Sequence, residues 1–238
     1  MRIVFVTPAF ERYELSDICF AQHRLAHIQL GDATSVVVAD DHNIDIAKSF
    51  GFWTIREDNE YLGRRFNAGI EFAYKELKAD YIVPIGSDSW IDYHYFEGLS
   101  PNVFRSATLQ TIFSPDGKER SDLKIRPALQ SGGVGPFVIP RAMLHKSNGR
   151  PCKDRLYNSC DLHTYLGLGE PEPEYLDLHP WQYTSFKSDP RTQPQISYYH
   201  RQIVKHAIHT TQDKPFDVLA DYFPYKLIQR IKRLYGGL

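Results

Sequence analysis

The sequence predicts an α/β protein with a mostly parallel central sheet flanked by helices. Within about the first ninety residues, four short apolar runs each end in a polar turn, and helical patterns separate them. The connections are short, and no internal repeat or low-complexity tract interrupts them. Strands and helices that alternate in this way form βαβ units, in which parallel strands are joined by right-handed crossovers.

The four predicted strands are continuous apolar runs, as expected for strands that are buried on both faces of a sheet. They comprise residues 3–6, 34–39, 52–55 and 81–85. The predicted helices between them comprise residues 16–30, 43–50 and 63–78. Ser16 is the expected N-cap of the first helix and Gly31 its stop, while Gly51 closes the second helix.

The pattern is less regular after residue 100. A loose alternation predicts a strand at 105–113 with a turn at 114–118, and an apolar run predicts another strand at 137–140. Short helices are expected at 141–146 and 158–168.

Residues 213–238 are predicted to form an amphipathic helical extension with a basic polar side, in which Pro224 breaks or starts the last helix. This helix could pack on the rest of the chain, form the contact of a homo-oligomer, or lie on a membrane surface. Packing or oligomerisation is favoured because the segment is short.

Composition and charge exclude several classes of protein. Hydrophobic residues make up 42% and charged residues 24% of the chain, as in ordinary globular domains, and the net charge of −1 gives no overall attraction to nucleic acid or anionic membranes. Cys19, Cys152 and Cys160 cannot all pair and form no Cys-x-x-Cys motif, which argues for a reducing compartment. No apolar run approaches the roughly 20 residues of a membrane span, and the first one is too short for a signal peptide. We therefore expect a cytoplasmic protein.

Three common site motifs are missing. The segment Gly132-Gly133-Val134-Gly135 lacks the Lys-Ser/Thr ending of a phosphate-binding loop. The first strand turns at Thr7-Pro8 without the glycines of a dinucleotide-binding fingerprint. No Gly-x-Ser-x-Gly elbow is present, so serine hydrolase chemistry is poorly supported.

The segment 79–92 is the most informative part of the sequence. Its apolar run ends in Gly86-Ser87-Asp88-Ser89, and Trp90 follows. Ligands of open α/β sheets bind beyond the carboxyl ends of such strands, and a carboxylate there suits a hard cation and a phosphorylated ligand. An ordinary polar surface turn is the alternative.

Four segments, in this order, resemble the GT-A-fold glycosyltransferases of the large family-two type. Residues 65–70 resemble the Arg-x-Asn-x-Gly-Ile helix start, and residues 81–91 resemble the apolar strand that leads to an Asp-x-Asp motif. Gly132-Gly133 with the strand after it is similar to the acceptor-side glycine segment, and residues 160–162 are similar to the Glu-Asp-x-Leu helix start. The matches span about 70% of the chain.

The resemblance implies a Rossmann-like GT-A fold with a C-terminal helical extension. The glycosyltransferase domain would comprise residues 1–212, with a nucleotide-binding half at about 1–92 and an acceptor half at about 93–212, followed by the extension at 213–238.

The resemblance also implies the chemistry. Asp88, with His179 as a late ligand, would hold Mn²⁺ or Mg²⁺ on the diphosphate of a nucleotide-sugar. The resemblance alone favours a UDP-sugar, because UDP is the commonest donor nucleotide of the family. Such a cation would act as a Lewis acid for the departing phosphate. Asp161 would be the base that accepts the acceptor's proton in an inverting transfer. N-capping by Asp161 and a structural role of His179 are the alternatives.

The remaining candidate site residues fall into two groups. The residues expected to contact the donor are Thr7, Pro8, Asp40, Asp58, Arg64 with Arg65 as its alternative, Asn67, Gly86, Ser87 and Asp88. The residues expected to contact the transferred sugar or the acceptor are Trp90, Gly132, Gly133 and Trp181. The alternatives are turn or surface roles for the acids, a solvated helix face for the arginines, and core packing for the two tryptophans.

Two departures from the family pattern leave other functions open. Gly86 stands where the first acid of Asp-x-Asp is expected, and Cys160 stands where the acid before the catalytic Asp is expected. A non-catalytic nucleotide-sugar-binding module is therefore one alternative, and a sugar nucleotidyltransferase-like enzyme is another, although residues 7–10 are not its glycine-rich basic loop. The acceptor could be a glycan, a lipid, a protein or a modified nucleic-acid base.

Overall fold

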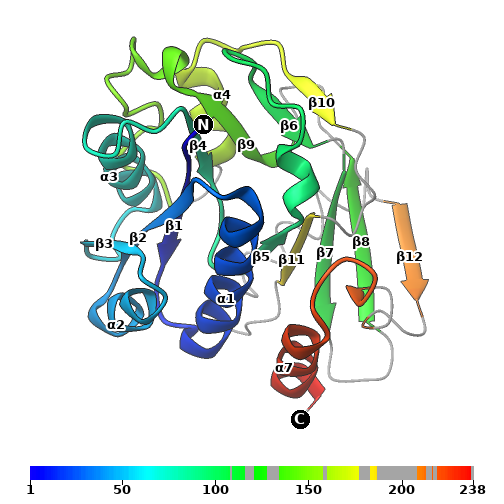
Figure 1. Ribbon diagram of the computed structural model, residues 1–238. Helices are drawn as coiled ribbons and strands as arrows, with labels where there is room; N and C mark the ends of the chain where they lie inside the picture. Colours follow the sequence, from blue (N-terminus) through cyan, green and yellow to red (C-terminus); the bar gives the residue numbers. More distant parts are fainter. Residues whose placement is uncertain are drawn as a thin grey trace.

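The protein contains two β-sheets, which stand side by side with helices packed on the larger one (Figure 1). The structure, a computed structural model, describes residues 1–107, 109–115, 121–127, 134–157, 160–176, 183–186, 208–212, 216 and 219–236.

The larger sheet has seven strands in the order β10-β6-β9-β4-β1-β2-β3. Its strands are β1 (Ile3–Ala9), β2 (Ala33–Ala39), β3 (Trp53–Arg56), β4 (Tyr81–Pro84), β6 (Arg105–Ala107), β9 (Val134–Pro140) and β10 (Glu174–Leu176). The first four are parallel to one another, with β1 in the centre between β2 and β4. β9 runs antiparallel to β4 and to β6. The mostly parallel sheet is thus as predicted.

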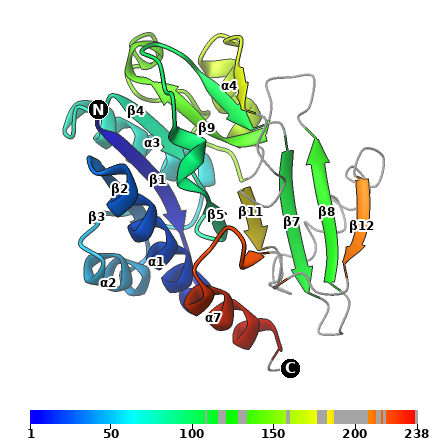
Figure 2. The same ribbon diagram turned by 45° about the vertical axis from the view of Figure 1, so that its right-hand side comes forward.

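The smaller sheet has five strands in the order β12-β8-β7-β11-β5. They are β5 (Ser89–Ile91), β7 (Leu109–Pro115), β8 (Ser121–Pro127), β11 (Tyr183–Phe186) and β12 (Ile208–Gln212). Figure 2 shows this sheet beside the parallel one, with β5 and β11 nearest to it. Because β5 follows β4 directly, the turn at 85–88 joins the two sheets.

Helices cover both faces of the parallel sheet. They are α1 (Tyr13–Leu30), α2 (Asp41–Ser49), α3 (Leu62–Lys75) and α4 (Cys160–Gly167). The other helices are α7 (Tyr225–Gly236), which packs on α1, and the 3₁₀ helices η1 (Tyr93–Phe96) and η2 (Arg141–Leu144). Alternate residues of β1 face opposite sides, so Val4 and Val6 pack with Ile70 of α3, whereas Phe5 packs with Ala26 of α1. Burial on both faces explains why the strands are continuous apolar runs.

Three differences from the predicted elements concern β1, α1 and the segment 105–113. β1 continues to Ala9, so the sheet edge lies beyond the expected Thr7-Pro8 turn. Helix α1 begins at Tyr13, one turn before the expected cap, and Ser16 is buried inside it. The predicted strand at 105–113 is two strands, β6 and β7, which belong to different sheets.

Helix α7 packs on α1 (Figure 2). Its apolar residues Leu227, Ile228 and Ile231 are buried with Ile18 of α1, and Arg230 forms an ion pair with Asp17. The apolar side of the extension is therefore used inside the chain, as in the packing interpretation, and a homo-oligomer contact through this helix stays a prediction. Among the helices described here, none has both the length and the apolar character needed to cross a membrane.

Candidate functional site

Arg12 and Asp88 meet at the edge of the parallel sheet where β1 and β4 end. Nη1 of Arg12 lies 3.0 Å from Oδ2 of Asp88, and its Nη2 lies 3.4 Å from Oγ of Ser87. The Asp88 side chain is 5% exposed and that of Arg12 is 23% exposed. This edge is where open α/β sheets bind their ligands. Sequence reasoning identified Asp88 but missed Arg12.

The turn between β1 and α1 directs Arg12 toward Asp88. Glu11 and Arg12 both have left-handed backbone conformations, with φ of 50° and 44°. Such conformations cost about 1–2 kcal/mol for a residue with a side chain, so the surroundings must hold them. Asp40 accepts a hydrogen bond of 2.9 Å from the backbone N–H of Glu11, and Asn43 donates one of 3.1 Å to the Glu11 carbonyl.

Asp40 is already bonded within the protein. Its second oxygen accepts from the backbone N–H of Asn43 at 2.9 Å, which caps α2. Asp40 therefore holds both the start of a helix and the turn that carries Arg12. Its expected contact with the base or ribose of a donor stays a prediction.

Asp88 is the only acid of the expected metal motif. Its Oδ2 binds Arg12, and its Oδ1 accepts a hydrogen bond of 3.1 Å from Ser89 Oγ. In the described part of the chain, no three His, Cys, Asp or Glu side chains are grouped as metal ligands. The other expected ligand, His179, lies outside the described residues. The described side chains therefore do not fit a divalent cation, because a hard cation requires several oxygen ligands and Asp88 supplies one carboxylate that is already paired.

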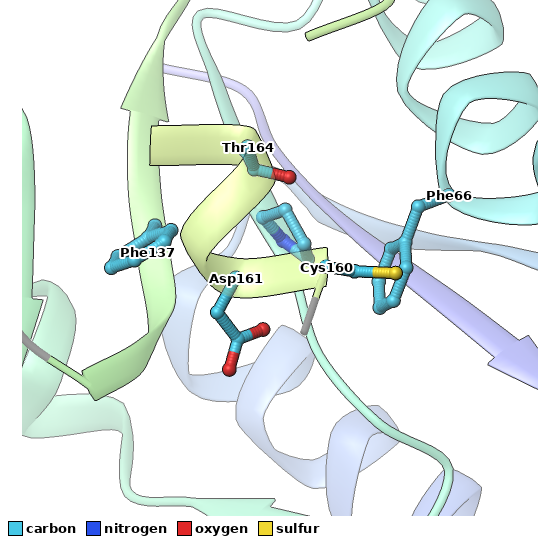
Figure 3. A pocket seen from close by; sticks show the side chains of 6 residues that line it. Phe66, Phe137, Cys160, Asp161 and Thr164 are labelled. Atoms are coloured by element: carbon cyan, nitrogen blue, oxygen red, sulfur yellow. The ribbon is translucent and has the colours of Figure 1, made fainter. Parts of the chain in front are cut away.

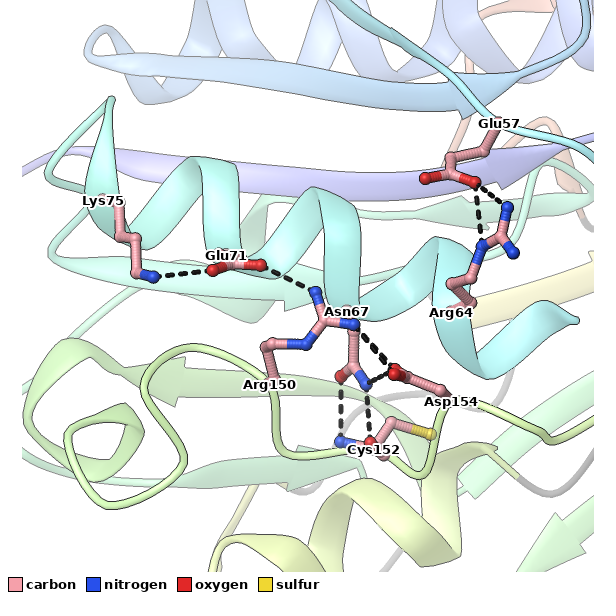
Figure 4. A network of polar contacts seen from close by, with 8 residues as sticks. All are labelled: Glu57, Arg64, Asn67, Glu71, Lys75, Arg150, Cys152 and Asp154. Atoms are coloured by element: carbon pink, nitrogen blue, oxygen red, sulfur yellow. Dashed lines mark hydrogen bonds and ion pairs between the residues drawn. The ribbon is translucent and has the colours of Figure 1, made fainter.

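The two neighbouring arginines of α3 have different surroundings. Arg64, the expected donor contact, binds Glu57 at 2.6 Å (Figure 4) and Asp58 at 2.9 Å, so its charge is balanced at the surface. Asp58, also an expected donor contact, accepts a hydrogen bond from the Arg64 guanidinium. Arg65 is instead 8% exposed, and its Nε is buried without a hydrogen-bond partner among the described residues. Burial lowers the pKa of Arg65, and the nearby charge of Arg12 lowers it further.

Asn67 holds a loop through its side-chain amide, and its expected contact with the donor stays a prediction. Its amide nitrogen donates to the Cys152 carbonyl at 2.6 Å and to Asp154 at 2.7 Å, and its amide oxygen accepts from the Cys152 N–H at 3.0 Å. Arg150 links this loop to Glu71 of the same helix (Figure 4). Because residues 150–154 precede α4, Asn67 helps to position the helix that carries Asp161.

Asp161 lies at the exposed start of α4 (Figure 3). Its carboxylate points away from the Cys160 and Thr164 side chains, and it borders a cavity of about 10 Å³, the size of one water molecule. Helix α4 begins at Cys160, so Asp161 lies in the first turn of the helix and is not its N-cap. The Asp161 side chain is exposed at this place, and its expected role as a base stays a prediction.

The pKa of Tyr183 of β11 is affected by the charges of both Asp88 and Asp161. Burial raises the pKa of Tyr183, and the charges of Asp161 and Asp88 raise it further. The charges of both acids therefore act on the same buried hydroxyl group. Sequence reasoning missed Tyr183, because a strand in the second sheet was not predicted there.

Several expected site residues are buried or lie outside the described chain. Trp90 is completely buried, with ring centroids 4.9 Å from those of both Phe186 and Phe223, so the packing interpretation applies and a sugar cannot stack on it. Thr7 and Pro8 are buried within β1. The expected site residues outside the described chain are Gly132, Gly133, His179 and Trp181.

Comparison with known proteins identifies the fold. No protein-family model matches the sequence, and no curated protein does. The S. aureus TarS 1–349 structure in complex with UDP-GlcNAc is similar at a TM-score of 0.57 and 13% identity, over 79% of this chain and 59% of that chain. TarS 1–349 alone gives a TM-score of 0.55 at 13% identity over 99% and 74% of the two chains, and its complex with UDP gives 0.55 at 12% over 93% and 70%.

These similarities confirm the predicted fold class. The chain has a Rossmann-like GT-A glycosyltransferase fold, with a mostly parallel sheet flanked by helices. It spans 59% of the length of the first of these structures. At 12–13% identity, the similarity establishes the fold alone.

Proposed function

We propose that this chain is a glycosyltransferase that moves a sugar from a nucleotide-diphosphate donor to an acceptor hydroxyl. The observation that carries the proposal is the pair of arginines, Arg12 and Arg65, gathered with Asp88 at the ligand-binding edge of a GT-A fold. The Arg65 guanidinium is largely buried, and its Nε has no hydrogen-bond partner among the described residues, an arrangement that is costly unless an anion compensates it. A diphosphate supplies that anion.

UDP-sugars are the first donors to test. The similar TarS structures contain UDP-GlcNAc or UDP. Arg65 and Arg12 would contact the diphosphate, because guanidinium groups match phosphate oxygens in both geometry and charge. The near-zero net charge of the chain means that this attraction is local to the site.

Asp161 is the proposed base. The acceptor oxygen forms a bond to the anomeric carbon while the bond from that carbon to the phosphate oxygen breaks, and the electron pair leaves with the nucleoside diphosphate. The acceptor's proton passes to the Asp161 carboxylate, on the face opposite the leaving group, so the anomeric configuration inverts. Asp161 suits this role because it is exposed at the start of α4 while Asp88 lies at the strand ends.

The mechanism assigns no step to a metal ion. Mn²⁺ or Mg²⁺ was expected at Asp88 with His179, and a bound cation would supply charge stabilisation for the leaving phosphate. In the described part of the chain, no three candidate ligands are grouped, and the Asp88 carboxylate is paired with Arg12. The acceptor stays a prediction among glycan, lipid, protein and modified nucleic-acid base.

A panel of nucleotide-sugars tests the proposal. The full chain is incubated with UDP-, GDP- and TDP-sugars, with Mn²⁺ or with EDTA, while thermal unfolding and nucleotide release are followed. We expect one nucleotide to raise the unfolding temperature and its sugar donor to be hydrolysed slowly. No shift with any donor in either buffer would refute a nucleotide-sugar site. Binding without release in the presence of varied acceptors would favour a non-catalytic binding module.

A further inference from the structure

The expected metal carboxylate is already bound by a cation of the protein itself. Asp88 is held by Arg12 at 3.0 Å, and Ser87 contacts the same guanidinium at 3.4 Å. The Asp88 side chain is 5% exposed, so its charge requires a partner at all times. A divalent ion at Asp88 would have to displace Arg12 or share the carboxylate with it.

The turn that carries Arg12 is built to keep the guanidinium at this place. Its two left-handed residues are fixed by Asp40 on the Glu11 N–H and by Asn43 on the Glu11 carbonyl. Strain that is held by several independent contacts is characteristic of functional sites. A surface ion pair of two flexible side chains would not need such support.

Gly86 is part of the same arrangement. A Cβ atom at this position would lie 2.6 Å from Oδ1 of Asp88. A side chain that completed an Asp-x-Asp motif would therefore require the Asp88 carboxylate to move from the orientation in which it binds Arg12. The glycine that removes one metal ligand also allows the ion pair.

We propose that Arg12 is the resident cation of the donor site, whose guanidinium binds the donor diphosphate and stabilises the charge on the departing nucleoside diphosphate, so that transfer requires no divalent metal. The inference rests on the function proposed above. Asp88 acts in it as a positioning residue that orients Arg12.

The charges around Arg12 agree with this role. Asp88 balances one positive charge, while Arg65 brings a second one close enough for the charge of Arg12 to lower the pKa of Arg65. Two guanidinium groups that repel each other are drawn together by an anion placed between them. A diphosphate has the negative charge and the paired oxygen acceptors that guanidinium groups bind through two N–H groups at once.

Calorimetric titration of the full chain with UDP and with GDP tests the inference. Each nucleotide is titrated in EDTA and again in Mn²⁺, and we expect one of them to bind in EDTA with an affinity that Mn²⁺ does not improve tenfold. Arg12→Gln should weaken this binding by about tenfold or more, since it removes a charge-assisted contact. Arg12→Lys keeps the charge and should weaken binding less. Arg2→Gln is the matched control, because Arg2 is exposed just before the opposite end of β1.

The relative loss of nucleotide binding in Asp88→Asn and Arg12→Gln distinguishes a site held by Arg12 from a site held by a metal ion. If Arg12 is the cation, Asp88→Asn loosens the guanidinium without removing its charge and weakens metal-free binding less than Arg12→Gln does. Binding that requires Mn²⁺ and is lost in Asp88→Asn but kept in Arg12→Gln would overturn the inference while leaving the glycosyltransferase proposal intact. Failure of every nucleotide to bind in both buffers would instead refute the proposed function. Circular dichroism melting of each variant verifies that it is folded.

Discussion

Two buried histidines of α1 should make the protein lose stability as the pH falls from 7 to 5. Nε2 of His23 lies 3.1 Å from the Ser89 carbonyl, and Nε2 of His27 lies 3.3 Å from Ser35 Oγ. Both Nδ1 atoms are buried without a hydrogen-bond partner among the described residues. Burial lowers the pKa of His23 from 6.5 to about 4, and burial together with the nearby His23 and Arg24 lowers that of His27 to about 3.

The sign and size of the effect follow from proton linkage. Above pH 6.5 both side chains are neutral in the folded and the unfolded chain, so they contribute no pH dependence. Below pH 6.5 the unfolded chain takes up two protons that the folded chain does not, and the free energy of unfolding falls until the folded-state pKa values are reached. At pH 5, which is 1.5 units below the unfolded value, the loss is about 2 kcal/mol for each histidine and about 4 kcal/mol for both. That is a large share of the roughly 5–15 kcal/mol by which a typical domain is stable.

Urea unfolding between pH 8 and pH 5 measures this loss. The double variant His23→Gln/His27→Gln is the control, because glutamine offers an uncharged donor to Ser89 and Ser35. Its stability should be nearly constant over the same range. Among the described residues, the carboxyls with lowered pKa are Glu71 and Asp154, whose ordinary values of 4.5 and 3.8 lie below this pH window. A wild-type loss under about 1 kcal/mol at pH 5, or an equal loss in the double variant, would contradict the linkage argument.

Three further substitutions test the site and the packing that supports it. Asp161→Asn should lower the turnover number by about 10²–10⁴-fold without a matching loss of nucleotide affinity, and steady-state kinetics with calorimetry would contradict the base assignment if turnover were unaffected. Gly69→Ala would place a Cβ 2.4 Å from Val6 Cγ1 and should lower the free energy of unfolding in urea by about 1–3 kcal/mol, whereas an unchanged midpoint would mean that α3 shifts freely on the sheet. Asn67→Ala leaves the Cys152 N–H and carbonyl unpaired and should cost about 2–3 kcal/mol in the same assay, with a loss below about 0.5 kcal/mol arguing that water replaces the amide.

The parallel half of the fold was predictable because its signals are local. Each of β1 to β4 is an apolar run next to a helix with its own stop, and Gly31 and Gly51 mark two of these stops. The second sheet was not predictable in the same way. β5 and β11 are three and four residues long, and they pair across more than ninety residues of sequence. Nothing in a short segment specifies a partner at that distance.

The choice between Arg64 and Arg65 depended on the rotation of one helix. Arg65 is four and eight residues before Gly69 and Ala73, which are buried on the sheet, so Arg65 points inward with them. Arg64 is offset by one residue and meets Glu57 and Asp58 at the surface. The helical spacing was present in the sequence and would have selected Arg65.

Trp90 and Asn67 show the opposite limit. An aromatic residue after a strand-end turn is consistent with a sugar platform or with core packing, and only the positions of Phe186 and Phe223 decide for packing. Asn67 lies in the expected motif, but its amide faces a loop 85 residues away in sequence. A motif places a residue near a site, whereas its hydrogen-bond partners determine its role.

Arg12 could not be found from any motif, because three separated features create its position. The left-handed turn at Glu11 and Arg12 aims the side chain, and Asp40, from the end of the next strand, holds the turn. Gly86 leaves the space in which the Asp88 carboxylate faces the guanidinium. In the sequence, Gly86 reads as the loss of a metal ligand and Arg12 as an unremarked loop residue. In the fold the two positions are linked, because a side chain at position 86 would crowd the Asp88 carboxylate that orients Arg12. A second acid at position 86 and this ion pair therefore cannot both be present unless the Asp88 side chain moves. The departure from the expected motif is therefore better explained as the exchange of a bound cation for a built-in one than as the decay of a metal site.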